Sequence, residues 1–434
     1  MLQASSDRLA QDLGVLARDI GVRLAGTSAE RAAADYVIDR ARATGADVWD
    51  EPFPMRARVV AEEQLEVRVG GSWRPFPCSL FSNTPGTDGA WESAGIATLT
   101  PTDYQRDDLG HLRGKAVIHL GCHIASRDAY RRLMKAGPAF LLMVDTRYPG
   151  ATALADGMFP EYTVAIGAVP TLNVAYQDAW SWIAHGATEA RCRVVGGMSA
   201  ATSQNVVIDL PGTDLAHEIL YASAHHDTQA ASPGADDNAS GVVGVIELAR
   251  LLQGRTRRRT VRLMSFGAEE QLSVGSAIYV RRHRDEVSRQ GRFMYNLDSF
   301  GSHLGWLQLY INAHQDFELA LRPYFRAADV YYQTITKVVP YADHFPFVAA
   351  GLAGVFHYRA NCDAGRFFHH RPDDDLSRVS ASLIARDVSV VATWIDEMSR
   401  IDALPFTPGI PEAQRPDVAS CWEDLFGGWN AAQM

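Results

Sequence analysis

Five short segments of the sequence place histidine or carboxylate side chains just after predicted strands or in loops. In chain order they hold His225 with Asp227, Asp237, Glu269 with Glu270, Asp298, and His370. In a parallel sheet such residues gather beyond the carboxyl ends of the strands, so we expect them at one edge. Mixed imidazole and carboxylate ligands suit zinc. The sequence therefore predicts a metal site.

Each segment alone also has an ordinary structural explanation. Asp236 and Asp237 precede a predicted helix, where aspartate commonly serves as an N-cap. Glu269 and Glu270, however, follow the apolar strand 261–266. Two carboxylates next to a buried strand are costly unless cations neutralise them. The coincidence of the segments favours metal over separate structural roles.

Charge counting favours two zinc ions. Their four positive charges are balanced by Asp237, Glu270, Asp298 and one zinc-bridging hydroxide. Glu269 is then left as a general base that is not a ligand.

The elements that must position these residues follow an α/β pattern. Short apolar strands are predicted at 205–210, 219–223, 261–266, 293–297 and 352–357, and a helix at 241–252. Strands that alternate with helices predict a mostly parallel, twisted sheet flanked by helices.

The 434 residues exceed what one hydrophobic core normally holds, so two domains are expected. Residues 53–198 have short strands broken by glycine, proline, asparagine and aspartate, which predicts a smaller β-rich inserted domain. The catalytic domain is then discontinuous, 1–52 and 199–400, followed by a C-terminal extension, 401–434.

The net charge of −10 argues against nucleic acid as a partner. No apolar run reaches the length that spans a bilayer, and the N-terminus lacks the apolar core of a signal peptide. The five scattered cysteines fit reduced thiols, so we expect a soluble, cytoplasmic protein. The basic cluster Arg255, Arg257, Arg258 and Arg259 is interpreted as a solvated turn, with an anion site as the alternative.

The strings SPGADDNASG, FGAEEQLSVGS, NLD, ADHFPF and HHRPDD, in this order, closely resemble the co-catalytic di-zinc aminopeptidases, a family that includes bacterial leucyl aminopeptidase and aminopeptidase Y. The resemblance implies that His225, Asp237 and Asp298 bind one zinc. It implies that Asp237, Glu270 and His370 bind the other, with Asp237 bridging. Glu269 would then take a proton from the bridging water and pass it to the leaving amine.

The same resemblance gives supporting residues. Asp227 would orient His225, and Asp343 with His344 matches a segment near the family's site. His369 stands where some relatives carry a tyrosine that steadies the oxyanion, so it is either a catalytic electrophile or a histidine packed beside the metals.

His226 is an alternative ligand to its neighbour. We prefer His225, because alternation along a strand would point it and Asp227 to one side.

Residues 53–198 resemble, more loosely, the protease-associated domain inserted into many relatives, through 111–121, 129–144 and 169–183.

The predicted function is a metal-dependent exopeptidase, an aminopeptidase acting on a peptide or small amide substrate. A carboxypeptidase or N-acyl amino acid hydrolase on the same di-zinc site is the alternative, because Arg359, Arg366 and Arg371 could bind a substrate carboxylate. A non-enzymatic binding relative is a third reading, disfavoured because such proteins lose ligands. The sequence leaves the oligomeric state open.

Overall fold

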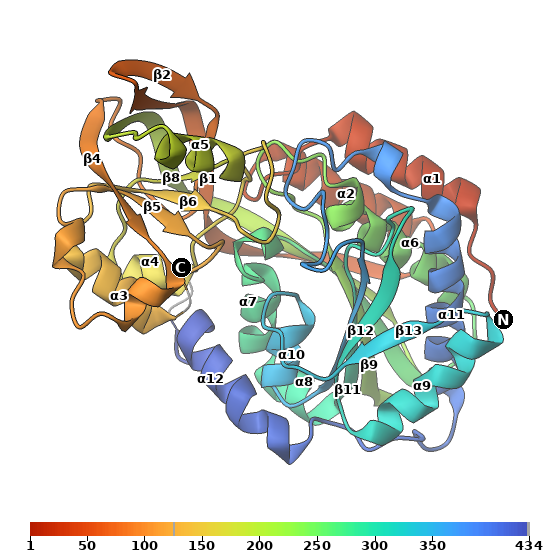
Figure 1. The fold of residues 1–434 in the computed structure, drawn as a ribbon. Coiled ribbons are helices and arrows are strands. Elements are labelled where there is room, and N and C mark those ends of the chain that lie inside the picture. The colour runs from red at the N-terminus through yellow and green to blue at the C-terminus, as the bar shows by residue number, and fades with distance from the viewer. Residues whose placement is uncertain (125, 432–434) are drawn as a thin grey trace. The chain divides into compact units, whose positions relative to one another are not determined.

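The computed structural model describes residues 1–124 and 126–431, which form two compact units (Figure 1). The larger unit consists of Met1–Met55, Thr202–Glu423 and the chain from Gly428 onward. The smaller unit consists of Arg56–Ala201 and Asp424–Gly427. The C-terminal helix α12, Arg415–Phe426, thus contributes residues to both units.

The larger unit contains a twisted, mostly parallel sheet. Its strand order is β13 (Tyr332–Ile335), β12 (Trp306–Asn312), β14 (Ala353–Ala360), β11 (Gly291–Leu297), β9 (Leu215–His225), β10 (Arg259–Phe266) and the end of β8 (Glu189–Leu210). The central strands β14, β11, β9 and β10 are parallel to one another. β8 pairs with β10 and β12 with β14 in the antiparallel sense. The predicted α/β fold class is confirmed.

Both faces of this sheet are buried, which explains why its strands read as continuous apolar runs. Along β9, Leu220, Ala222 and Ala224 belong to one core, and Ile219 and Tyr221 to the other. The first core is completed by helices α1 (Ser6–Gly14), α2 (Ser28–Arg42), α6 (Ser240–Leu252), α9 (Gln315–Ala327) and α11 (Ala381–Arg400). The second core includes residues of α7 (Val274–Arg282), α8 (Arg284–Gln290) and α10 (His344–Ala349). None of the described helices is long and apolar enough to cross a membrane.

The smaller unit has its own core and a parallel run of strands. β4 (Glu92–Leu99), β5 (Ala116–Leu120), β6 (Phe140–Val144) and β7 (Thr171–Val174) are parallel, and β3 (Cys78–Leu80) is antiparallel to β7. The same unit contains the helices α3 (Arg127–Ala136), α4 (Pro160–Ile166) and α5 (Tyr176–Ala184). A hairpin of β1 (Asp47–Val69) with β2 (Ser72–Phe76) adds to the unit.

A buried arginine joins the N-terminal segment to the loops that follow β9. Arg23 is fully buried, and its guanidinium donates hydrogen bonds to the carbonyl oxygens of Leu16, Gly21, His226, Pro233 and Gly234. A guanidinium presents its N–H donors in a fixed fork, so it can satisfy carbonyls that face it from several directions. These contacts fix the two segments around His225 and Asp237.

We expect Arg23→Lys to lower the free energy of unfolding by roughly 3 kcal/mol, because an ammonium cannot satisfy all of these buried carbonyls. Chemical denaturation with an unchanged m-value would measure the loss. Arg18→Lys, at a side chain 67% exposed, is the control and should change stability by no more than about 0.5 kcal/mol. Equal stability of the two variants would contradict this role for Arg23.

Candidate metal centre

His225 is the last residue of β9, and its imidazole is surrounded by carboxylates. Nε2 lies 3.2 Å from Asp237 Oδ1, 3.6 Å from Asp298 Oδ1 and 3.7 Å from Glu269 Oε2, and Nδ1 lies 3.4 Å from Asp227 Oδ1. Burial by itself lowers the pKa of His225, but the surrounding carboxylates raise it well above its ordinary value. This electrostatic demand for positive charge is what a bound cation would satisfy.

The adjacent imidazole points elsewhere. His226 Nδ1 lies 3.0 Å from Ser265 Oγ, and its Nε2 lies 3.3 Å from the amide nitrogen of Gln204. Burial lowers the pKa of His226 to about 4, so it is neutral at ordinary pH. The structure therefore directs His225, not His226, toward the carboxylates.

Asp237 lies between two groups of possible ligands. Its Oδ1 faces His225, while Oδ2 lies 3.5 Å from His370 Nε2 and 3.4 Å from His369 Nδ1. It is not an N-cap, because α6 begins after Ala239 without a side-chain cap. Instead, Asp374 accepts the backbone N–H groups of Asp236 and Asp237, at 2.9 and 3.0 Å, which fixes the segment.

Glu269 and Glu270 follow β10 in a short turn, and Asp227 holds both. One Asp227 oxygen accepts the backbone N–H of Glu269 at 3.0 Å and the other that of Glu270 at 3.1 Å. The two side chains then separate. Glu270 Oε2 lies 2.8 Å from His370 Nε2, whereas Glu269 Oε1 accepts from Ser273 Oγ at 3.1 Å.

Two sets of residues have ligand atoms within 4.8 Å of one another and share Asp237: His225 with Asp237 and Asp298, and Asp237 with His369 and His370. The first equals the ligand set implied for one zinc. The second differs from the set implied for the other zinc, because it holds His369 where Glu270 was expected. Glu270 still lies next to this set, with Oε2 2.8 Å from His370 Nε2. The donors are carboxylates and imidazoles, all buried except the half-buried His369, and they suit zinc, so they fit the expected pair of ions.

His369 and Arg366 form a pair inside the site. The guanidinium of Arg366 donates to His369 Nδ1 at 2.7 Å, and the His369 ring stacks on His370 with centroids 3.4 Å apart. A ring whose Nδ1 accepts a hydrogen bond carries its proton on Nε2, when neutral. Arg366 Nη1 also lies 3.0 Å from Asp237 Oδ2.

Asp343 and His344 lie at the start of α10 and are fully buried. Asp343 Oδ1 accepts from Ser276 Oγ at 2.5 Å, and burial raises the pKa of Asp343 to about 8. His344 stacks on Phe356, and burial lowers its pKa to about 3. Neither belongs to the two ligand sets, and a supporting role for them stays a prediction.

Two contributors went unrecognised in the sequence. Asp374 occurs only as one letter of the HHRPDD string, and Arg23 only as one letter of the N-terminal region. Each acts through backbone groups of distant residues, so local spacing gives no signal for them.

Residues 205–395 match the family model described as Peptidase family M28. This part of the chain is a peptidase family M28 domain. The match supports the expected peptidase family, and the imidazole and carboxylate donors of the two ligand sets support zinc as the cofactor. The assignment of single residues to single ions stays a prediction.

The whole chain is similar to named aminopeptidases. It is 22% identical over 419 residues to aminopeptidase YwaD of Bacillus subtilis, covering 94% of this chain and 88% of that protein. It is 26% identical to leucine aminopeptidase 2 of Arthroderma otae, covering 64% of this chain and 55% of the fungal protein. A solved zinc aminopeptidase of Bacillus subtilis has the same fold, with a TM-score of 0.78, 20% identity, and 95% and 99% of the two chains covered.

We expect the purified protein to bind about two zinc ions per chain, and Glu270→Gln to bind about one, because the substitution removes an anionic ligand candidate beside His370. Metal analysis after zinc reconstitution and desalting measures both numbers. Glu412→Gln, at an exposed carboxylate, should keep the wild-type content. A full complement in Glu270→Gln would assign that ligand position to His369.

Proposed function

We propose that this M28 protein is an aminopeptidase that removes N-terminal residues from short peptides. The observation that carries the proposal is the placement of Glu269. Its Oε2 lies 3.7 Å from His225 Nε2, whereas the neighbouring Glu270 turns to His370, with Oε2 2.8 Å from Nε2. A buried carboxylate beside the ligand candidates, and not needed as one of them, is what peptide hydrolysis at such a centre requires.

His225, Asp237 and Asp298 would hold one zinc, and Asp237, Glu270 and His370 the other. Zinc, when bound, acts as a Lewis acid that polarises a carbonyl and lowers the pKa of water. The remaining contributions come from the chain's own residues.

Glu269 is built to move a proton. Its Oε1 is fixed by Ser273 Oγ–H at 3.1 Å, which leaves Oε2 directed toward the centre. Burial raises the pKa of Glu269 well above its ordinary value, against the opposing charge of His225. The carboxylate would take a proton from the attacking water at Oε2 and deliver it to the leaving amine.

His369 and Asp227 would act beside this transfer. The Arg366 contact at Nδ1 leaves Nε2–H of a neutral His369 as the donor, which suits stabilisation of a developing oxyanion. Asp227 positions Glu269 and Glu270 through their backbone and lies 3.4 Å from His225 Nδ1, so it connects the base, a ligand and the strand end.

A second candidate substrate class has a free carboxylate at the cleaved residue, as for a carboxypeptidase or N-acyl amino acid hydrolase. Of the three arginines considered for this role, Arg359 pairs with Asp387 at 2.7 Å and Arg371 with Asp373 at 3.1 Å. Arg366 alone among these three faces Asp237. It is the residue on which this alternative depends.

The protease-associated character of residues 53–198 and a cytoplasmic location remain part of the proposal, with the sequence as their support.

We expect Glu269→Gln to retain both zinc ions while turnover falls by roughly 10²–10⁴-fold, because glutamine keeps the size of the side chain but cannot accept the proton. Steady-state kinetics and metal analysis on the same preparation separate the two effects. Added zinc should restore part of the activity of Glu270→Gln and none of that of Glu269→Gln. Loss of metal from Glu269→Gln would reverse the assignment of the pair.

A panel of aminoacyl and N-acyl amino acid chromogenic amides distinguishes the two substrate classes. We expect hydrolysis of substrates with a free α-amino group, with kcat/KM at least about 10-fold above that for N-acyl substrates, since 1.4 kcal/mol of differential binding gives that ratio. Preference for N-acyl substrates that collapses in Arg366→Met would instead support the carboxylate-directed alternative.

A further inference from the structure

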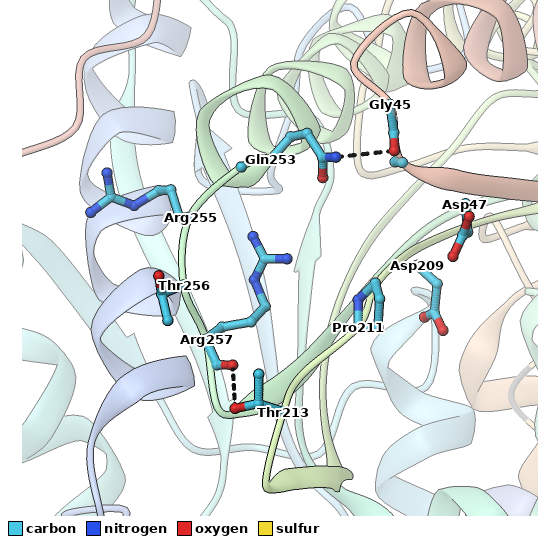
Figure 2. A pocket seen from close by; sticks show the side chains of 11 residues that line it. Gly45, Asp47, Asp209, Pro211, Thr213, Gln253, Arg255, Thr256 and Arg257 are labelled. Atoms are coloured by element: carbon cyan, nitrogen blue, oxygen red, sulfur yellow. Dashed lines mark hydrogen bonds between the residues drawn. The ribbon is translucent and has the colours of Figure 1, made fainter.

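A cavity of about 470 Å³ lies in the larger unit, lined by none of the residues assigned to the metal centre (Figure 2). Its wall includes Gly45 and Asp47 at the start of β1, Asp209 at the end of β8, and the turn after α6 with Gln253 and Arg257. Gln253 closes one side by donating to Gly45 O at 3.0 Å. A volume of this size is typical of a small-molecule site.

Arg257 differs from the other arginines of its segment. Arg255 pairs with Asp396, Arg258 with Asp214, Arg259 with Glu218 and Arg262 with Asp209. Among the described residues Arg257 has no carboxylate partner, although it is 7% exposed. Its one side-chain hydrogen bond goes to the Leu252 carbonyl at the end of α6.

The electrostatics of Arg257 follow from this setting. Burial lowers the pKa of Arg257; the charge of Asp396, which is itself paired with Arg255, opposes this shift, and the charge of Arg255 adds to it. A guanidinium has five N–H donors, and the Leu252 carbonyl occupies one of them. A buried guanidinium in a cavity, with N–H donors that are not used by the protein, can bind an oxyanion.

Two aspartates in the cavity wall determine which anions can bind beside Arg257. Asp209 is already paired with Arg262 at 2.8 Å, while Asp47 is exposed and makes no ion pair within the described chain. Both carboxylates would repel a phosphate dianion. Asp47 would attract an ammonium group on a ligand whose carboxylate sits on Arg257.

We propose that this cavity, the Arg257 pocket, binds a free α-amino acid, with its carboxylate on Arg257 and its ammonium group facing Asp47. The side chain would extend past Gln253 and the backbone of Gly45 and Gly254, where there is no Cβ to restrict it. The pocket contains none of the residues proposed for peptide hydrolysis, and the proposal is tested by ligand binding. Its outcome is therefore independent of the proposed peptidase activity.

The test is calorimetric titration of the zinc-loaded full chain with glycine, and in parallel with acetate, methylammonium and inorganic phosphate. We expect a glycine site in the wild type that weakens at least about tenfold in Arg257→Gln, because a charge-assisted contact is removed. Arg258→Gln removes a neighbouring charge that has its own carboxylate partners, and should leave the site unchanged. Amino acid bound at the metal centre would persist in all variants.

Asp47→Asn keeps the test decisive if Arg257→Gln is poorly folded, because Asp47 is exposed and makes no side-chain hydrogen bond among the described residues. It should weaken glycine binding about tenfold and should not weaken acetate binding, since acetate has no ammonium group and is repelled by the Asp47 carboxylate. Glycine binding that is equal in wild type, in Asp47→Asn and in a folded Arg257→Gln would overturn the proposal. Tighter binding of phosphate than of glycine would overturn it as well.

Discussion

The negative charge buried at the carboxyl edge of the larger sheet is the constraint on which the structure of this site depends. Asp227, Asp237, Glu269 and Asp298 all approach one imidazole, that of His225, within 3.2–3.7 Å. Carboxylates at this density repel one another strongly where water is excluded. The parallel strands bring these carboxylates together, and bound cations and N–H donors are needed to offset the repulsion between them.

The chain supplies part of that compensation from its own backbone. Asp227 and Asp374 each accept two consecutive backbone N–H groups, those of Glu269 with Glu270 and of Asp236 with Asp237. These carboxylates therefore act as clamps for the residues that face the centre. The loop that carries Asp237 and the turn that carries Glu269 and Glu270 are thus fixed by the same interaction, one aspartate that accepts two adjacent backbone N–H groups.

The sequence was sufficient for the fold class and for which residues would meet, and insufficient for how they are held. Alternation at the end of β9 predicted that the side chains of His225 and His226 point in opposite directions. The apolar strand before Glu269 predicted that this residue is buried. Both predictions use local patterns. Asp374 and Arg23 act on backbone groups that are distant along the chain, which no periodicity encodes. Both Glu270 and His369 lie against His370, and this arrangement depends on side-chain directions that cannot be derived from the sequence.

The discontinuity of the larger unit has a consequence for how the protein is made. Helices α1 and α2 are translated before α6, but the core they share with α6 is completed only after Arg56–Ala201 of the smaller unit has been translated. At usual elongation rates the synthesis from Arg56 to Leu252 takes roughly 10–40 s. Throughout that interval the apolar faces carrying Leu9, Leu13 and Val37 lack their final partners. During synthesis these two helices therefore expose apolar surface of the kind that promotes aggregation of incompletely folded chains.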